Sequence, residues 1–115
     1  MARISNSDVS REVQGKRPFV TNNKTMEGKW QTYTTLDGQV GRTYAVFSYG
    51  NHFPMYVYDQ QAGVWVGNKD KYSRTTTTHQ NKARPREQID FWFETEMIRK
   101  VVWNGLAPII ANRME

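Results

Sequence analysis

The centre of the chain alternates between apolar and polar residues, a pattern typical of β-strands. The clearest strand is 43–49, where Tyr44, Val46 and Ser48 share one face and Thr43, Ala45, Phe47 and Tyr49 share the other. Similar aromatic and β-branched segments lie at 29–36, 52–59 and 64–67, separated by turn signals at Asp37–Gly38, Gly50–Asn51 and Ala62–Gly63. We therefore predict a small twisted antiparallel sheet of three to five strands over residues 29–78.

Residues 86–103 have the periodicity of an amphipathic helix. The apolar positions recur every fourth residue, at Ile89, Phe93, Met97 and Val101. Acidic side chains gather in the first half and basic ones near the end, which complements the helix dipole, and Asn104–Gly105 supplies a stop. This C-terminal helix is expected to pack on one face of the sheet. The predicted fold class is α+β, with a single domain over 29–115 that ends in an apolar tail, 104–115.

Residues 1–28 are predicted to form a polar arm that precedes this domain. The arm is rich in Ser, Asn, Lys and Arg. Ser7 and Asp8 suit the cap of a short helix, with Val9 and Val13 as its apolar stripe. A partly ordered tail and a docked short helix are both compatible with this pattern.

Composition narrows the function classes. The chain of 115 residues is long enough for one core, and an aromatic content of 13% is too high for a disordered chain. The absence of cysteine excludes disulfides and thiolate metal sites and favours a reducing, intracellular compartment. The sequence has no apolar stretch of about 18 residues and no secretory signal at its start, so we expect neither a membrane-bound nor a secreted protein.

The sequence offers little catalytic chemistry. His52 and His79 are its only histidines, and neither stands at the spacing of a zinc site. It contains no glycine-rich phosphate loop and no nucleophile elbow. Ser48 or Ser73 with a histidine would make a nucleophile–base pair, but serines and histidines are too common for this signal to carry weight. We therefore predict no catalytic residue, no metal site and no cofactor, in a protein that is not an enzyme.

The most distinctive segment is 68–86, which we predict to be a basic loop. Six cations face one carboxylate there, so its net charge of +5 equals that of the whole chain. Cations bind phosphates by Coulomb attraction and counterion release, and tyrosines offer flat faces to unpaired bases. The candidate nucleic-acid-binding residues are Lys69, Lys71, Tyr72, Arg74, Lys82, Arg84 and Arg86. The alternative interpretation is a solvated loop without a partner.

The aromatic residues fall into two groups. Large rings on apolar faces are expected in the core: Phe47, Phe53, Trp65 and Trp92. The remaining group is open between core and exposed surface: Tyr56, Tyr58 and Tyr72.

A longer residue pattern runs through the second half of the sheet region and the basic segment. It comprises Tyr44-x-Val46-x-Ser48-Tyr49, His52-x-Pro54, Trp65, Asn68-x-Asp70-Lys71-Tyr72-Ser73-x-Thr75-Thr76, His79-Gln80 and Arg84-Pro85, with Arg17-Pro18-Phe19 upstream. In these residues the chain resembles a family of short, uncharacterised proteins encoded by bacteriophages and plasmids. The resemblance covers about residues 15–85 and leaves out 86–103. It implies a phage or mobile-element origin and a host-cell cytoplasmic location, and it implies no known activity.

Two functions from different classes follow. The first is a small, non-enzymatic phage or mobile-element protein that contacts DNA or RNA through the basic residues of 69–86 and neighbouring tyrosines. The alternative is a protein–protein inhibitor or modulator of a host enzyme or defence system, because an aromatic, Thr-rich surface also suits protein contacts. No membrane partner is expected. An exposed sheet edge or the tail 104–115 would allow a homodimer, and the sequence does not decide the oligomeric state.

Overall fold

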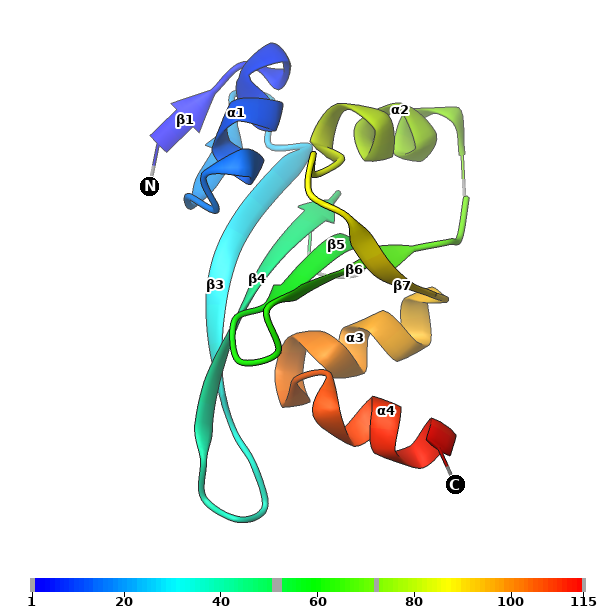
Figure 1. Ribbon diagram of the computed structural model, residues 1–115. Coiled ribbons are helices and arrows are strands. Elements are labelled where there is room, and N and C mark those ends of the chain that lie inside the picture. Colours follow the sequence, from blue (N-terminus) through cyan, green and yellow to red (C-terminus); the bar gives the residue numbers. More distant parts are fainter. Residues whose placement is uncertain (1, 51–52, 72, 115) are drawn as a thin grey trace.

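Seven strands form one continuous sheet in which each strand is hydrogen-bonded to the next along the chain (Figure 1). The structure is a computed structural model that describes residues 2–50, 53–71 and 73–114. The strands are β1 (Ala2–Ile4), β2 (Phe19–Thr21), β3 (Met26–Thr34), β4 (Val40–Ser48), β5 (Pro54–Asp59), β6 (Val64–Asn68) and β7 (Ile89–Phe93). The outermost pairs, β1–β2 and β6–β7, are parallel, and the four pairs between them are antiparallel.

The prediction of a three- to five-stranded antiparallel sheet with one helix on one face is wrong. The sheet is mixed and has seven strands, and it extends beyond 29–78 at both ends. Its additional strands come from the supposed arm, which supplies β1 and β2, and from the supposed helix, which supplies β7. Parallel pairing at both edges joins segments that are far apart in the chain, and short-range patterns do not reveal such pairing.

The predicted helix over 86–103 is a strand followed by a helix. Phe91 and Phe93 stack on one face of β7 with ring centroids 5.8 Å apart, whereas Trp92 packs on the other face against Tyr56. Helix α3 (Thr95–Asn104) begins only after this strand. A strand and a helix both satisfy a spacing of four residues, because four is twice the strand period of two. The interval between 89 and 93 therefore did not distinguish them.

The start of α3 is fixed by a carboxylate from a distant loop. Oδ2 of Asp70 accepts hydrogen bonds from both the backbone N–H and the hydroxyl of Thr95, each at 2.8 Å. An acidic group is favourable at a helix N-terminus. The predicted stop at Asn104–Gly105 is confirmed, since α3 ends at Asn104 and Gly105 has a φ of 81°.

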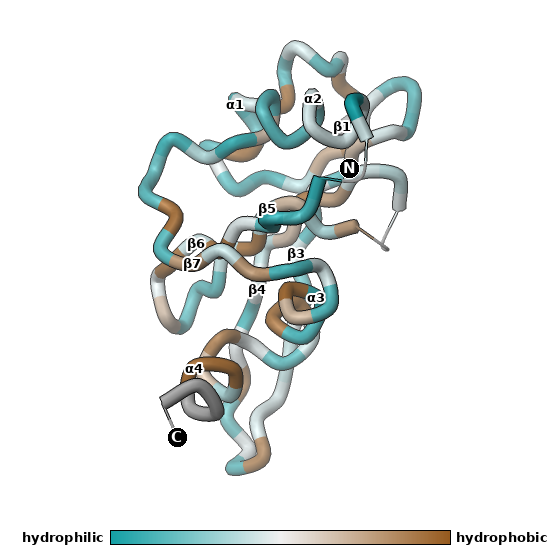
Figure 2. The backbone as a smooth tube through the Cα atoms, turned by 90° about the vertical axis from the view of Figure 1, so that its right-hand side faces the viewer, coloured by the Kyte–Doolittle hydropathy of each residue, from teal (hydrophilic) through white to brown (hydrophobic). Residues whose placement is uncertain are grey.

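The segment predicted as a basic loop contains a helix, α2 (Arg74–Ala83). The Ser73 side chain caps it by accepting a hydrogen bond of 3.1 Å from the Thr76 backbone N–H. The buried face of α2 includes Thr76, His79 and Gln80, so it is polar. Figure 2 shows α2 as largely hydrophilic, in contrast to the hydrophobic stretches of α3 and of α4 (Ala107–Met114). Hydrophobic periodicity therefore gave no helix signal here.

The N-terminal segment packs against the sheet as a short helix, which was one of the two interpretations of residues 1–28. A short 3-10 turn, η1 (Asn6–Asp8), leads into α1 (Val9–Gln14), whose Val9 and Val13 are both fully buried. Asp8 stands at the N-cap position but makes no side-chain capping bond there. Packing of the two valines, and not the predicted cap, holds this helix.

Helices cover both faces of the sheet, and each face has its own core (Figure 1). Tyr44 and Val46 belong to the core under α1 and α2, and Ala45 and Phe47 belong to the core under α3 and α4, which confirms the predicted faces of these four residues. The prediction that Tyr49 shares the face of Ala45 and Phe47 is wrong, because its left-handed backbone, with a φ of 56°, brings its ring to within 5.4 Å of the His79 ring of α2. Of the rings expected in the core, Phe47, Phe53 and Trp65 are buried. Trp92 is 39% exposed, so that prediction is wrong.

Candidate functional site

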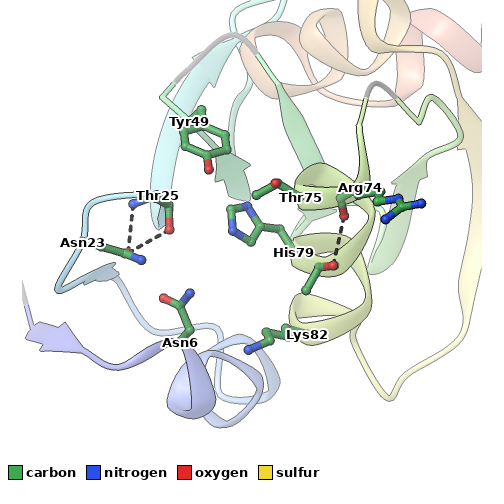
Figure 3. A pocket seen from close by; sticks show the side chains of 9 residues that line it. Asn6, Asn23, Thr25, Tyr49, Arg74, Thr75, His79 and Lys82 are labelled. Carbon is green, nitrogen blue, oxygen red and sulfur yellow. Dashed lines mark hydrogen bonds between the residues drawn. The ribbon is translucent and has the colours of Figure 1, made fainter.

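A cavity of about 360 Å³ lies beside α2, where four parts of the chain meet (Figure 3). Its lining comes from η1, the β2–β3 connection, the residue after β4 and one flank of α2. The lining residues are Asn6, Asn23, Thr25, Tyr49, Arg74, Thr75, Thr78, His79 and Lys82. The cavity thus depends on the docked N-terminal segment and on the helix that sequence patterns did not indicate.

Helical spacing brings the α2 residues to the cavity. Arg74, Thr78 and Lys82 are four residues apart and share one flank, and Thr75 and His79 repeat the same interval. In Figure 3 the side chains of Thr75, His79 and Lys82 are directed toward the cavity. The Arg74 guanidinium is turned away from it. Lys82 is therefore the cation that the cavity itself presents.

The His79 side chain is buried and is oriented by a hydrogen bond to the sheet. Its ring is 4% exposed, and Nδ1 shares a hydrogen bond of 2.7 Å with the hydroxyl of Ser48 at the end of β4. Burial, and secondarily the positive charge of Lys82, lower the pKa of His79 below its usual 6.5, so the imidazole is neutral at pH 7. Within the described part of the chain, the structure gives Nε2 no hydrogen-bond partner.

Tyr49 forms the upper rim of the cavity. Its backbone has a φ of 56°, a left-handed conformation that a bulky residue rarely adopts. Its N–H donates to the carbonyl of Thr25 at 2.8 Å, which ties β4 to the β2–β3 connection. The ring lies 5.4 Å from the His79 ring and is 56% exposed. Strained backbone of this kind clusters at functional sites, which makes Tyr49 a candidate binding residue.

The opposite wall is ordered by a small hydrogen-bond network. Oδ1 of Asn23 accepts from the hydroxyls of Thr21 and Thr25, each at 2.8 Å. These bonds leave the side-chain amide N–H groups of Asn23 as donors. Asn6 adds a second amide from η1 on the same side (Figure 3).

The electrostatic character of the cavity is that of an anion site. None of the described residues that line it is acidic, and the first turn of α2 also carries no carboxylate. Lys82 and the positive end of the α2 dipole at Arg74 and Thr75 both favour negative charge. Amides, hydroxyls and one imidazole supply neutral hydrogen-bond donors. Such a lining suits a phosphate group.

The candidate residues predicted from the sequence do not share one surface. Of the seven, Arg74 and Lys82 line the cavity. Lys69 forms an ion pair of 3.2 Å with Glu94, near the start of α3, and Lys71 donates to Oε1 of Gln80 at 3.2 Å. Tyr72 lies outside the described residues, as does His52.

The last two candidate cations follow the C-terminal end of α2. The Arg84 guanidinium lies over the Trp92 ring, 5.4 Å from its centroid. Arg86 is exposed, and its backbone N–H donates to Oε1 of Gln14 in α1. The basic segment thus distributes its charge around α2, with only part of it at the cavity.

Several residues that carry the resemblance anchor α2 to the sheet. The Nε2 group of Gln80 donates to the backbone carbonyls of Asn68 and Asp70, at 3.0 and 3.1 Å. The hydroxyl of Tyr56 donates to the carbonyl of Gln80 at 2.7 Å. With the Ser73 cap, these bonds fix how far α2 lies along the sheet.

Sequence reasoning missed Asn6, Asn23, Thr25 and Tyr49. Asn6, Asn23 and Thr25 come from turns that carry no motif, and Tyr49 belongs to the residue pattern 44–49, which did not indicate a binding role, so only the fold brings them to α2. The one available signal was the repeat of four in the basic segment, at positions 74, 78 and 82. It becomes meaningful only when the segment is treated as a helix.

No three His, Asp and Glu side chains of the described residues are placed to hold a metal ion. A second cavity, of about 240 Å³, lies beside Asp59. The Asp59 carboxylate accepts from the Tyr33 hydroxyl and from the Leu106 N–H, at 3.1 and 2.8 Å. Burial is the main cause that raises the pKa of Tyr33 to about 12, so this hydroxyl stays protonated near neutral pH.

Comparison of the chain with protein-family models, curated proteins and solved structures finds no match. Among residues 2–50, 53–71 and 73–114, no helix has both the length and the apolar character needed to cross a membrane.

Proposed function

We propose that this protein is a small, non-enzymatic binding protein of a phage or mobile element that contacts single-stranded DNA or RNA through the cavity beside α2. The observation that carries the proposal is the juxtaposition of an acid-free cavity, which presents Lys82, with the exposed ring of Tyr49 on its rim. Phosphate and base are two of the three parts of a nucleotide, and a cation and an exposed aromatic ring are the groups that bind them. The proposed location is the cytoplasm of the host cell.

Two interactions support this binding: electrostatic attraction of the phosphate and stacking of the base on an aromatic ring. Lys82 and the α2 N-terminus attract a phosphate, and counterion release makes this attraction depend on salt. The Tyr49 ring offers a flat face to an unpaired base. Beyond the cavity, Arg84 over the half-exposed ring of Trp92 supplies a second cationic and aromatic surface at the end of α2. A single strand fits this arrangement better than a duplex, whose bases are already stacked.

The relation of Ser48 to His79 supports binding and not nucleophilic catalysis. Ser48 is 1% exposed and is not one of the residues that line the cavity, so the His79 ring separates its hydroxyl from any ligand. A nucleophile must reach its substrate. The serine is therefore better placed to orient the imidazole.

The proposal is tested by fluorescence anisotropy with short labelled oligonucleotides over a range of salt concentrations. The parent is expected to bind single strands more tightly than duplexes and to lose affinity as salt rises. Lys82→Gln should lower the slope of log affinity against log salt by about one unit. Lys100→Gln is the matched control, because Lys100 is an exposed lysine on α3, beyond the other face of the sheet. No binding by the parent at low salt would contradict the proposal.

The alternative, modulation of a host protein, is favoured by one separate observation. The tip of the β3–β4 hairpin extends away from the rest of the molecule (Figure 1) and exposes Leu36 fully and Val40 largely. Exposed apolar groups at a projecting tip suit insertion into a partner. Pull-down from nuclease-treated host lysate, with parent and Leu36→Ser side by side, tests it. A specific partner that is lost only with Leu36→Ser would favour this function.

A further inference from the structure

The cavity beside α2 is closed at its inner end by a buried imidazole. His79 is 4% exposed, and Ser48 behind it is 1% exposed. Asn6 and Asn23 stand across from α2 and form the side walls (Figure 3). An internal phosphate carries chain on two sides, whereas a terminal phosphate carries chain on one side only, so a strand end is the part of a strand better shaped to enter a cavity closed by His79.

Some of the cavity's hydroxyls are already occupied as donors. The Thr78 hydroxyl donates to the carbonyl of Arg74 at 2.9 Å, and the Thr25 hydroxyl donates to Asn23. These groups shape the walls and offer a ligand only lone pairs.

Other donors are uncommitted. Within the described part of the chain, the Thr75 hydroxyl, the Lys82 ammonium and Nε2 of His79 have no protein partner. When Nδ1 of His79 accepts from the Ser48 hydroxyl, the ring proton sits on Nε2 and can be donated. Lys82 alone brings three donors.

This donor set fits a terminal phosphate better than an internal one. A phosphomonoester presents three terminal oxygens and between one and two negative charges near pH 7. An internal phosphodiester has one charge and esterifies one more oxygen. A cation, an imidazole N–H and a hydroxyl that line one cavity match the larger number of acceptors and the larger charge.

We propose, building on the proposed function, that the cavity binds the terminal phosphomonoester of a nucleic-acid strand, with Lys82, Nε2 of His79 and the Thr75 hydroxyl as its ligands. Tyr49 at the rim is placed to stack on the terminal base. The protein thereby distinguishes strand ends that carry a phosphate from those that carry a hydroxyl.

The test compares otherwise identical single-stranded oligonucleotides with a 5′-phosphate, a 3′-phosphate or hydroxyls at both ends, each labelled at the other end or internally. The parent is expected to bind one phosphorylated end about tenfold or more tightly than the hydroxyl form, as one or two added charge-assisted hydrogen bonds would give. Competition with a nucleoside monophosphate and with inorganic phosphate separates a strand end from a free small molecule. A strand end should compete far better than either.

Two variants probe the ligands independently. His79→Gln and Thr75→Val should each lose most of the preference for a phosphorylated end, and Thr75 is exposed, so its replacement leaves the core intact. Thr32→Val is the matched control, since Thr32 is an exposed threonine on β3 outside the cavity lining. It should keep the preference.

The outcomes separate this inference from the proposed function. Equal affinity for phosphorylated and hydroxyl ends, with salt-dependent strand binding intact, would overturn the inference and leave the function standing. Stronger competition by the free mononucleotide than by the strand would show that the ligand is a nucleotide and overturn the strand-end assignment. No binding of any oligonucleotide would overturn both.

Discussion

Ser48→Ala isolates the hydrogen bond that positions the imidazole. The change removes the hydroxyl that lies 2.7 Å from Nδ1 of His79, at a site where both residues are buried. The remaining Nδ1 then has no partner in a place that water reaches poorly. A buried polar atom left without its partner costs about 1–3 kcal/mol in the free energy of unfolding. For a chain of 115 residues this corresponds to a melting temperature lower by roughly 4–12 °C.

The same change should weaken recognition of a terminal phosphate. Without the bond to Ser48, nothing fixes which ring nitrogen of His79 carries the proton, so Nε2 no longer serves reliably as a donor. We expect the preference for a phosphorylated end to fall several-fold while the salt dependence that Lys82 provides is kept. Urea denaturation and anisotropy titrations on the same protein preparations measure the two effects.

Ser7→Ala serves as the control, because Ser7 is exposed on η1 and its loss should change stability by less than about 0.5 kcal/mol. If Ser48→Ala unfolds at the same urea concentration as the parent, the Ser48–His79 bond contributes nothing to stability and our account of the closed end of the cavity is wrong. If the variant is destabilised but recognises phosphorylated ends as well as the parent, the ring does not act through Nε2.

Three further predictions concern the core under α3, the rim of the cavity and the buried imidazole. Phe93→Ala should lower the free energy of unfolding by about 3–5 kcal/mol, because Phe93 is 1% exposed in the core under α3; a melt identical to that of the parent would contradict this packing. Tyr49→Asn should change the free energy of unfolding by less than about 1 kcal/mol, because asparagine tolerates a φ of 56°. The same change should weaken strand binding by about 1–3 kcal/mol, because the stacking of the ring on a base is lost. Undiminished affinity in anisotropy titrations would refute the role of the ring. The folded chain lowers the pKa of His79 below 6.5, so the unfolded chain binds the proton more readily and stability should fall as the pH drops below about 6.5. Urea midpoints at pH 7.5 and 5.5 should therefore differ less in His79→Gln than in the parent, and an equal difference would argue against a buried neutral imidazole.

The strands that could be predicted from the sequence are those in which successive side chains alternate clearly between the two faces of the sheet. In 43–49, strict alternation assigned Tyr44 and Val46 to one face and Ala45 and Phe47 to the other, and the two cores confirm it. Antiparallel neighbours joined by short turns keep this information local. The edge strands β1 and β7 pair in parallel with segments that precede or follow an intervening helix, so their partners are not neighbours in sequence.

The candidate site could be predicted only in part for a related reason. Charge alone drew attention to Arg74 and Lys82, and both line the cavity. Charge equally drew attention to Lys69, which an ion pair with Glu94 holds near α3. The residues opposite α2 come from segments that lie 25 or more positions away in the chain. The sequence around these residues gives no sign that the fold brings them close to Lys82.

Helix α2 explains why a polar segment was both hard to recognise and suited to a binding site. An apolar stripe allows a helix to slide along its sheet at small cost, because apolar contacts have little direction. Hydrogen bonds weaken steeply when their distance or angle departs from the optimum. The bonds of Gln80 to the carbonyls of Asn68 and Asp70, together with the bond of His79 to Ser48, therefore fix the position of α2 along β4 and β6. That position sets Lys82 and the His79 ring relative to Tyr49, so the polar residues that hide the helix from pattern analysis are the ones that define the geometry of the cavity.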